Sequence, residues 1–121
     1  MHTCFNDEAT CAWVAGLLEG EGCFTASRRK YGIGISVQCN MCDQDVIYSL
    51  DACTENIGYI TGPRRQCGLG TKPYWHWQVG KKSDVVALCL TLLPHMCSRR
   101  ANRILDLLIV ANHFKSSDIA A

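Results

Sequence analysis

The chain has 121 residues, 48% of them hydrophobic, which fits one globular domain with a single core over residues 1–121 and excludes a disordered chain. Its longest apolar stretch, residues 85–93, falls far short of the roughly 20 residues of a membrane span, and the opening MHTCFNDEAT lacks the basic start and apolar middle of a signal peptide. The net charge of +1 selects no partner by itself, so we expect a soluble, intracellular domain that is neither secreted nor in contact with a membrane.

The first half of the chain predicts a helix, a β-hairpin and a second helix. Asn6 or Asp7 can cap a first helix that ends in the GEG at residues 20–22. Residues 23–30 are a short strand, and residues 33–40 (IGISVQCN) alternate apolar and polar side chains with the period of a half-buried strand. The YG pair between them favours a hairpin turn. Asp43 can cap a second helix, which Gly58 would end.

The second half predicts another hairpin and two further helices. Residues 59–65 and 74–80 are strands joined by a glycine-rich loop at residues 66–73. Ser83 or Asp84 can cap a third helix that Pro94 breaks, and residues 98–114 form the last helix. The order α-β-β-α-β-β-α-α predicts an α+β domain with an antiparallel sheet, and helices must cover the Ile, Val and Trp face of that sheet.

The opposite face of the sheet predicts a binding surface. There the alternation places hydrogen-bonding side chains, rather than the Lys and Glu of a plain soluble surface. Trp75 and Trp77 alternate with these side chains and are expected in the core, not as stacking platforms for bases. His76 is expected to face outward and contact a base or a phosphate, with a structural histidine or a metal ligand as the other readings.

Basic and acidic residues are separated along the chain. Residues 22–42 and 56–83 contain eight of the 12 basic residues and none of the 11 acidic ones. A basic surface is the footprint of a polyanion such as a nucleic acid. The plainer reading is a set of solvated loops whose Lys and Arg serve solubility.

The nine cysteines allow either a disulfide scaffold or a reduced protein that uses Cys as a small apolar residue. Their odd number and their positions in apolar helical patterns favour reduced thiols. Cys39 and Cys42 form a CxxC pair, but no second pair of ligands follows to complete a zinc site.

The stretch WVAGLLEGEGCF at residues 13–24 places two glycines four residues apart on one side of a helix. A glycine inside a helix costs about 1 kcal/mol relative to alanine, so Gly16 and Gly20 indicate the close approach of another helix. No other predicted helix has a matching stripe, and the simplest partner is the same helix of a second copy on a two-fold axis. We expect this dimer interface to include Trp13, Gly16, Leu17 and Gly20.

Two copies of this helix would bring two Glu21 carboxylates together. Carboxylates this close repel each other or take up protons unless cations neutralise them, and Mg²⁺ binds carboxylate oxygens and water. A pair of such ions can hold the attacking and leaving oxygens of a phosphodiester. The alternative is an ordinary helix end, with Glu19 and Glu21 as solvated surface acids.

Residues 14–22 resemble, in register, the signature of the LAGLIDADG homing endonucleases. The segments SVQCNMCDQDVIYSL, NIGYITG, YWHWQV and LLPHMCSRRANRIL follow in the order usual for that family. Members with a single motif act as homodimers, and this chain has one. The resemblance implies a saddle-shaped antiparallel sheet in the DNA major groove, with helices on its other face and acids of both subunits binding divalent metal. It also implies cleavage of both strands across the minor groove, which leaves 3′ overhangs.

The resemblance assigns the acids of the site. Glu21 matches the essential metal-binding acid, with Gly20 beside it in the metal site. Glu19 matches the first acid of the motif, whose role is more structural. The family usually has Asp at both places.

The supporting catalytic residues depart further from the family pattern. The glutamine often found near the end of the second strand would fall on Met41, so Gln38 is expected to serve instead, with Asn40 nearby. The basic residue expected before the last helix is Arg99 or Arg100, where the family has Lys. An arginine stays charged, so it would steady a phosphate rather than carry a proton.

The alternation and the resemblance together predict the residues that contact DNA. Arg and Gln can pair with guanine and adenine in the major groove, whereas Lys contacts to phosphates position a protein without reading sequence. The expected DNA-binding set is Thr25, Ser27, Arg29, Lys30, Ser36, Gln38, Asn40, Thr61, Arg64, Arg65, Lys72, Tyr74, His76 and Gln78.

We therefore expect a site-specific double-strand DNA homing endonuclease, of the kind tied to intron or intein mobility, acting as a homodimer on a palindromic or nearly palindromic target. It would hydrolyse phosphodiesters with Mg²⁺, or with another divalent cation such as Mn²⁺ or Ca²⁺. One alternative is a protein of the same fold that does not cleave, either a DNA-binding regulator or an RNA maturase. Another is a small zinc-dependent interaction module built on Cys39 and Cys42.

Overall fold

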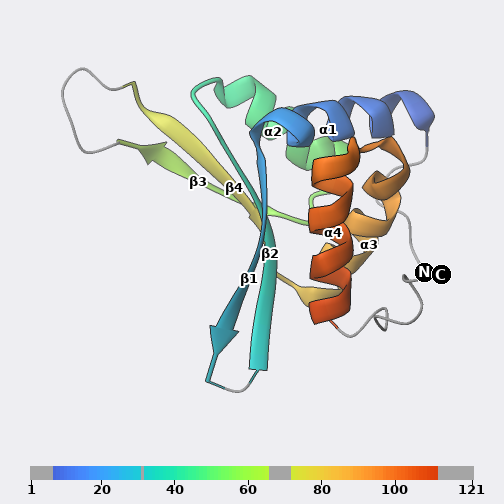
Figure 1. Cartoon of the computed structure of the whole chain (residues 1–121). Coiled ribbons are helices and arrows are strands. Elements are labelled where there is room, and N and C mark those ends of the chain that lie inside the picture. Colours follow the sequence, from blue (N-terminus) through green and yellow to red (C-terminus); the bar gives the residue numbers. More distant parts are fainter. Residues whose placement is uncertain (1–6, 31, 66–71, 112–121) are drawn as a thin grey trace.

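The computed structural model describes residues 7–30, 32–65 and 72–111, without the side chains of residues 28 and 29. Four helices and a four-stranded sheet follow one another in the predicted order (Figure 1). The elements are α1 (Glu8–Glu21), β1 (Gly22–Arg29), β2 (Gly32–Met41), α2 (Gln44–Cys53), β3 (Tyr59–Arg64), β4 (Tyr74–Val79), α3 (Lys82–Leu92), the 3₁₀ turn η1 (Leu93–His95) and α4 (Ser98–Val110).

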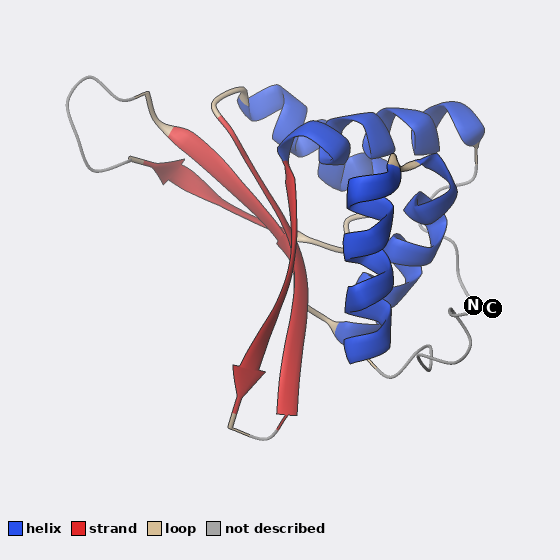
Figure 2. Ribbon diagram, in the orientation of Figure 1, coloured by secondary structure: helices blue, strands red, loops and turns tan. Residues whose placement is uncertain are grey.

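The sheet is antiparallel throughout, with the strand order β1-β2-β4-β3. The two hairpins therefore meet through β2 and β4, and β1 and β3 form the edges. The hairpins diverge from a crossing point, so the sheet is strongly twisted, and the helices lie on one side of it (Figure 2). This arrangement confirms the predicted α+β fold with helices on one face.

The alternation predicted for the strands is confirmed by burial. Val37, Cys39, Trp77 and Val79 face the helices and are buried in one hydrophobic core with residues of all four helices. The register pairs Val37 with Val79 and Cys39 with Trp77, so apolar side chains lie side by side across β2 and β4. The neighbouring positions of each strand face the opposite, open side of the sheet.

Trp77 is fully buried, as predicted, and its indole fixes the entry into β3. Its Nε1 donates to Asp51 Oδ1 at 3.0 Å, and the same oxygen accepts from the backbone N–H of Gly58 at 3.1 Å. A Cβ on Gly58 would lie 2.4 Å from Trp77 Nε1, so only glycine fits there. Gly58 therefore makes room for the tryptophan and does not end α2.

The expected end of the second helix is wrong by several residues. α2 ends at Cys53, and Glu55 and Asn56 then both take φ of 59°. Two consecutive left-handed residues cannot continue a right-handed helix, so the chain reverses before Gly58. At the other end Asp43 is the N-cap residue, as predicted, but its side chain makes no capping hydrogen bond.

The expected cap of the third helix is also wrong. α3 begins at Lys82 with Lys81 as N-cap, so Ser83 and Asp84 lie in its first turn, where a negative charge is favoured by the helix dipole. The earlier start lets Val85 N donate to Lys81 O at 2.9 Å and buries Val85 completely. Although α3 is mostly apolar, no helix within the described ranges has the length and hydropathy needed to cross a bilayer.

Candidate nucleic-acid interface and acidic centre

The open face of the sheet carries the polar side chains that the alternation predicts. Register places Thr25 opposite Ser36, Gln38 opposite Gln78, and Asn40 opposite His76. On β3 the same register brings Thr61 opposite His76 and Arg64 opposite Tyr74. We call this side the polar face; its described members are Cys23, Thr25, Ser27, Ser36, Gln38, Asn40, Tyr59, Thr61, Arg64, Tyr74, His76 and Gln78.

One hydrogen-bonded group on this face links β1 and β2. Thr25 Oγ1 and Ser36 Oγ are 2.7 Å apart, and Gln38 Nε2 donates to Ser36 Oγ at 3.1 Å. Ser36 retains only 6% of its exposure. Ser36 thus lies beneath its neighbours and orients the more accessible Thr25 and Gln38.

A second group on the polar face surrounds His76. Its Nδ1 is 2.5 Å from Asn40 Oδ1, and its Nε2 is 3.0 Å from Gln78 Oε1. The side chain is only 7% exposed, so both ring nitrogens are engaged and the ring is covered. The outward orientation predicted for His76 is therefore observed, together with a burial that alternation does not reveal.

The remaining predicted contacts lie at the ends of the hairpins. Arg64, Arg65 and Lys72 are exposed near the far end of the β3–β4 hairpin, and Lys30 and Ser27 are exposed near that of β1–β2. The backbone of Arg29 pairs with Gly32 at the polar face, while its side chain is outside the described part.

Two side chains on β3 differ from expectation in their accessibility. Tyr59, which sequence reasoning missed, is 52% exposed and lies opposite Gln78 on the polar face. Its place two residues before Thr61 in the same strand is the signal that would have found it. Thr61 Oγ1, by contrast, is buried and has no hydrogen-bond partner among the described residues.

Glu21 stands where α1 passes into β1, beside the end of the polar face. It is exposed, and the next residue, Gly22, pairs with Cys39 on β2. Burial, and secondarily the charge of Glu21, raises the pKa of the Cys39 thiol to about 11. The carboxylate is therefore close to the strand that carries Gln38 and Asn40.

A single chain does not assemble a metal centre around Glu21. Across residues 7–30, 32–65 and 72–111, no three His, Cys, Asp or Glu side chains converge as ligands. Cys39 faces the core with a neutral thiol, whereas Cys42 is exposed, so the CxxC pair does not present two thiolates to zinc. The seven described cysteines are all free thiols.

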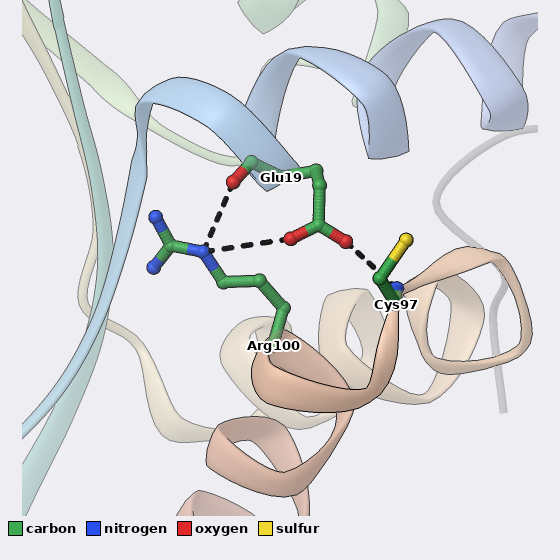
Figure 3. A network of polar contacts seen from close by, with 3 residues as sticks. All are labelled: Glu19, Cys97 and Arg100. Atoms are coloured by element: carbon green, nitrogen blue, oxygen red, sulfur yellow. Dashed lines mark hydrogen bonds and ion pairs between the residues drawn. The ribbon is translucent and has the colours of Figure 1, made fainter.

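Glu19 has a structural role, in line with the sequence expectation. Its Oε1 accepts from Cys97 N at 2.7 Å, at the N-cap position of α4, and its Oε2 lies 3.8 Å from Arg100 Nε (Figure 3). Arg100 Nε also donates to the backbone O of Glu19 at 3.0 Å. A carboxylate at a helix N-terminus is stabilised by the free N–H groups and by the helix dipole.

Replacing Glu19 by Ala is expected to lower the free energy of unfolding by about 1 kcal/mol, because the first N–H of α4 loses its acceptor. Glu19→Gln keeps an oxygen for Cys97 N and should lose less. Chemical denaturation monitored by circular dichroism measures both. Equal stability of the alanine variant and the original chain would show that this contact contributes nothing.

The basic residues at the start of α4 divide into two roles. Arg100 is held by Glu19, so it is half-buried, whereas Arg99 is exposed. Arg99, Arg100 and Arg103 line a groove of about 340 Å³ with Cys23, Phe24 and Thr25. Arg103, which sequence reasoning missed, donates from Nε to Phe24 O at 2.8 Å on the edge strand β1. Its signal was the spacing of four residues from Arg99, which places both on one side of α4.

The glycines of α1 lie on an open side of the helix. A Cβ on Gly16 or Gly20 would meet nothing within 4 Å, whereas a Cβ on Gly22 would lie 2.6 Å from Leu18 O. The packing of this chain therefore explains Gly22 but not the other two. Trp13, on the same helix, is 42% exposed.

Comparisons with known proteins identify the fold. No family model matches the chain, and no curated protein matches it. Among solved structures, the homing endonuclease I-CvuI bound to a DNA target in the presence of Ca superposes with a TM-score of 0.69 at 14% identity, covering 91% of this chain and 70% of that one. I-TnaI, another homing endonuclease, gives 0.65 at 17% identity, covering 84% and 71%.

The LAGLIDADG meganuclease I-AabMI bound to uncleaved DNA gives 0.67 at 18% identity, and this chain spans only 39% of its length. I-CvuI has also been solved with Mg on a DNA that was not cleaved. The chain therefore has the fold of the LAGLIDADG homing endonucleases, which confirms the resemblance of residues 14–22.

Proposed function

We propose that this protein is a site-specific double-strand DNA endonuclease that acts as a homodimer with divalent metal ions. The observation that carries the proposal is the position of Glu21, which lies at one end of the polar face and directly after the glycine side of α1. A second copy packed on that side would bring two such carboxylates and two polar faces to one centre.

Dimerisation is supported by what the two glycines fail to contact. Gly16 and Gly20 each cost helix stability, and no atom of this chain lies where their Cβ would be. A helix backbone from another subunit is the neighbour that requires such residues. Trp13 and the half-buried Leu17 flank the glycines and would complete the interface.

The metal would be held by Glu21 of each protomer, with the backbone oxygen of Gly20 as an oxygen ligand beside it. Carboxylate and carbonyl oxygens suit hard divalent cations such as Mg²⁺, Mn²⁺ or Ca²⁺. The I-CvuI complexes with Ca and Mg support this class of ion. Such ions supply a Lewis acid that activates water and stabilises the leaving oxygen of a phosphodiester.

The chain's own groups have distinct tasks around that centre. Gln38, held through Ser36, would orient the attacking water with its Oε1, which the contact with Ser36 leaves available. Arg99 would stabilise the charge on the phosphate, because a guanidinium does not exchange its proton at neutral pH. The polar face would read bases in the major groove, and Lys30 and Lys72 would contact phosphates.

The proposal is tested by cleavage of a randomised duplex library in Mg²⁺, with sequencing of the new ends. We expect cuts within one nearly palindromic sequence, both strands broken with 3′ overhangs, and no cuts in excess EDTA. Selective binding of one duplex without cleavage would instead identify a DNA-binding regulator of the same fold. Binding to structured RNA alone would favour a maturase. Cleavage that is unaffected by EDTA would contradict the metal mechanism.

A further inference from the structure

The cluster of Asn40, His76 and Gln78 has a hydrogen-bonding pattern that constrains all three side chains. Amide oxygens lie against both ring nitrogens of His76, at 2.5 Å for Asn40 and 3.0 Å for Gln78. An amide oxygen only accepts hydrogen bonds, so each ring nitrogen must carry a proton to form this arrangement. The observed arrangement is therefore that of the positively charged imidazolium.

The neutral ring requires a different arrangement. One ring nitrogen then has a lone pair, and it needs a donor in front of it. Asn40 or Gln78 can supply that donor by rotating its amide, which turns the NH₂ group toward the ring and the oxygen away. The protonation of His76 thus determines which amide atom is left for a third molecule.

The amide atoms left over are those that base edges distinguish. In the observed arrangement Asn40 Nδ2 and Gln78 Nε2 have no hydrogen-bond partner among the described residues, so two donors remain. Donors pair with guanine O6 and N7 or with thymine O4, whereas an outward oxygen accepts from adenine N6 or cytosine N4. Asn40 is exposed, and Gln78 is half-buried, while His76 itself is covered.

We propose that His76 is a positioning residue that sets, through Asn40 and Gln78, which base the polar face prefers. The inference rests on the proposed DNA-reading function of that face. His76 does not touch the base; it decides whether an amide donates or accepts. The imidazolium selects guanine or thymine at both amides, and the neutral ring changes one of these preferences to adenine or cytosine.

The surroundings leave the imidazole as the group that changes charge. Asn40 on β2 and Thr61 on β3 face His76 across the sheet, and neither ionises. On β4 its flanking residues Trp75 and Trp77 point to the core side. The titratable side chains on the same face of β3 and β4 are Tyr59, Arg64 and Tyr74. Histidine is the type among these whose charge ordinarily changes between about pH 5 and pH 8.

The test is selection of bound duplexes from a randomised library in Ca²⁺ at about pH 5.5 and about pH 8, a range that spans histidine titration. The original chain is expected to enrich different bases at one position of each half-site, with preference changing about tenfold between the two conditions. His76→Gln, whose amide does not titrate in this range, should enrich the same base at both. Asn40→Ala and Gln78→Ala identify the amide responsible, because only one of them should remove the pH-dependent position.

His95→Gln is the matched control, since His95 is exposed on η1 and outside the polar face. It should reproduce the pH-dependent preference of the original chain. One enriched sequence that is the same at both pH values would overturn the role of His76 and leave the proposed function standing. A library that enriches no sequence at either pH would overturn both. A pH effect that persists unchanged in His76→Gln would assign the switch to another group.

Discussion

Glu21→Gln is expected to reduce cleavage of the selected duplex by at least about a thousandfold, the scale on which removal of one transition-state contact acts. The amide has the shape of the carboxylate but no charge to hold a divalent cation, so water activation is lost from both half-sites. DNA binding should change little, because Glu21 makes no part of the polar face. Cleavage rates in Mg²⁺ and affinities in Ca²⁺ measure the two effects separately.

Glu19→Gln is the matched control for this experiment. It removes a charge two residues away on the same helix, while its remaining oxygen can still accept from Cys97 N. We expect it to cleave, because Glu19 is engaged with the start of α4 rather than with the proposed metal. Full cleavage by Glu21→Gln would remove that carboxylate from the mechanism. Equal loss in both variants would point to the local charge of the helix end instead of a specific ligand.

The sequence predicts the fold well because the signals are local. In β2, the side chains of Ile35, Val37 and Cys39 alternate with polar ones, and this period of two fixes both the strand and its buried side. Asp7 ends the chain's approach to α1 by accepting from Thr10 N at 2.7 Å, a capping contact between residues three apart. Such features need no knowledge of the rest of the molecule.

The parts that the sequence does not predict depend on distant residues. The partner of Glu19 is the backbone of Cys97, which belongs to another helix, and no local pattern indicates that pairing. Alternation places His76 and Ser36 on the polar face but gives no information about depth, which follows from the neighbouring strands that cover them. The start of α3 moved to Lys82 because burial of Val85 outweighs the capping preference of Ser83.

Gly16→Ala is expected to have opposite effects on the fold and on the dimer. Within one chain the added Cβ meets nothing within 4 Å, so it should raise the free energy of unfolding of the monomer by about 1 kcal/mol through the better helix propensity of alanine. Across the proposed interface the same atom separates two helix backbones and should weaken association. Gly22→Ala is the control, because its Cβ would lie 2.6 Å from Leu18 O and should destabilise the monomer.

Gly16→Leu should then abolish the dimer without unfolding the chain. A leucine side chain fits into the open space beside α1 of one protomer, but it occupies the volume that a second helix would need. Sedimentation velocity should show a dimer for the original chain and a monomer for this variant, with the same far-ultraviolet circular dichroism. Cleavage should fall together with dimerisation, since a monomer has only one Glu21. A variant that still sediments as a dimer would exclude this side of α1 as the interface, and the shared metal centre would be excluded with it.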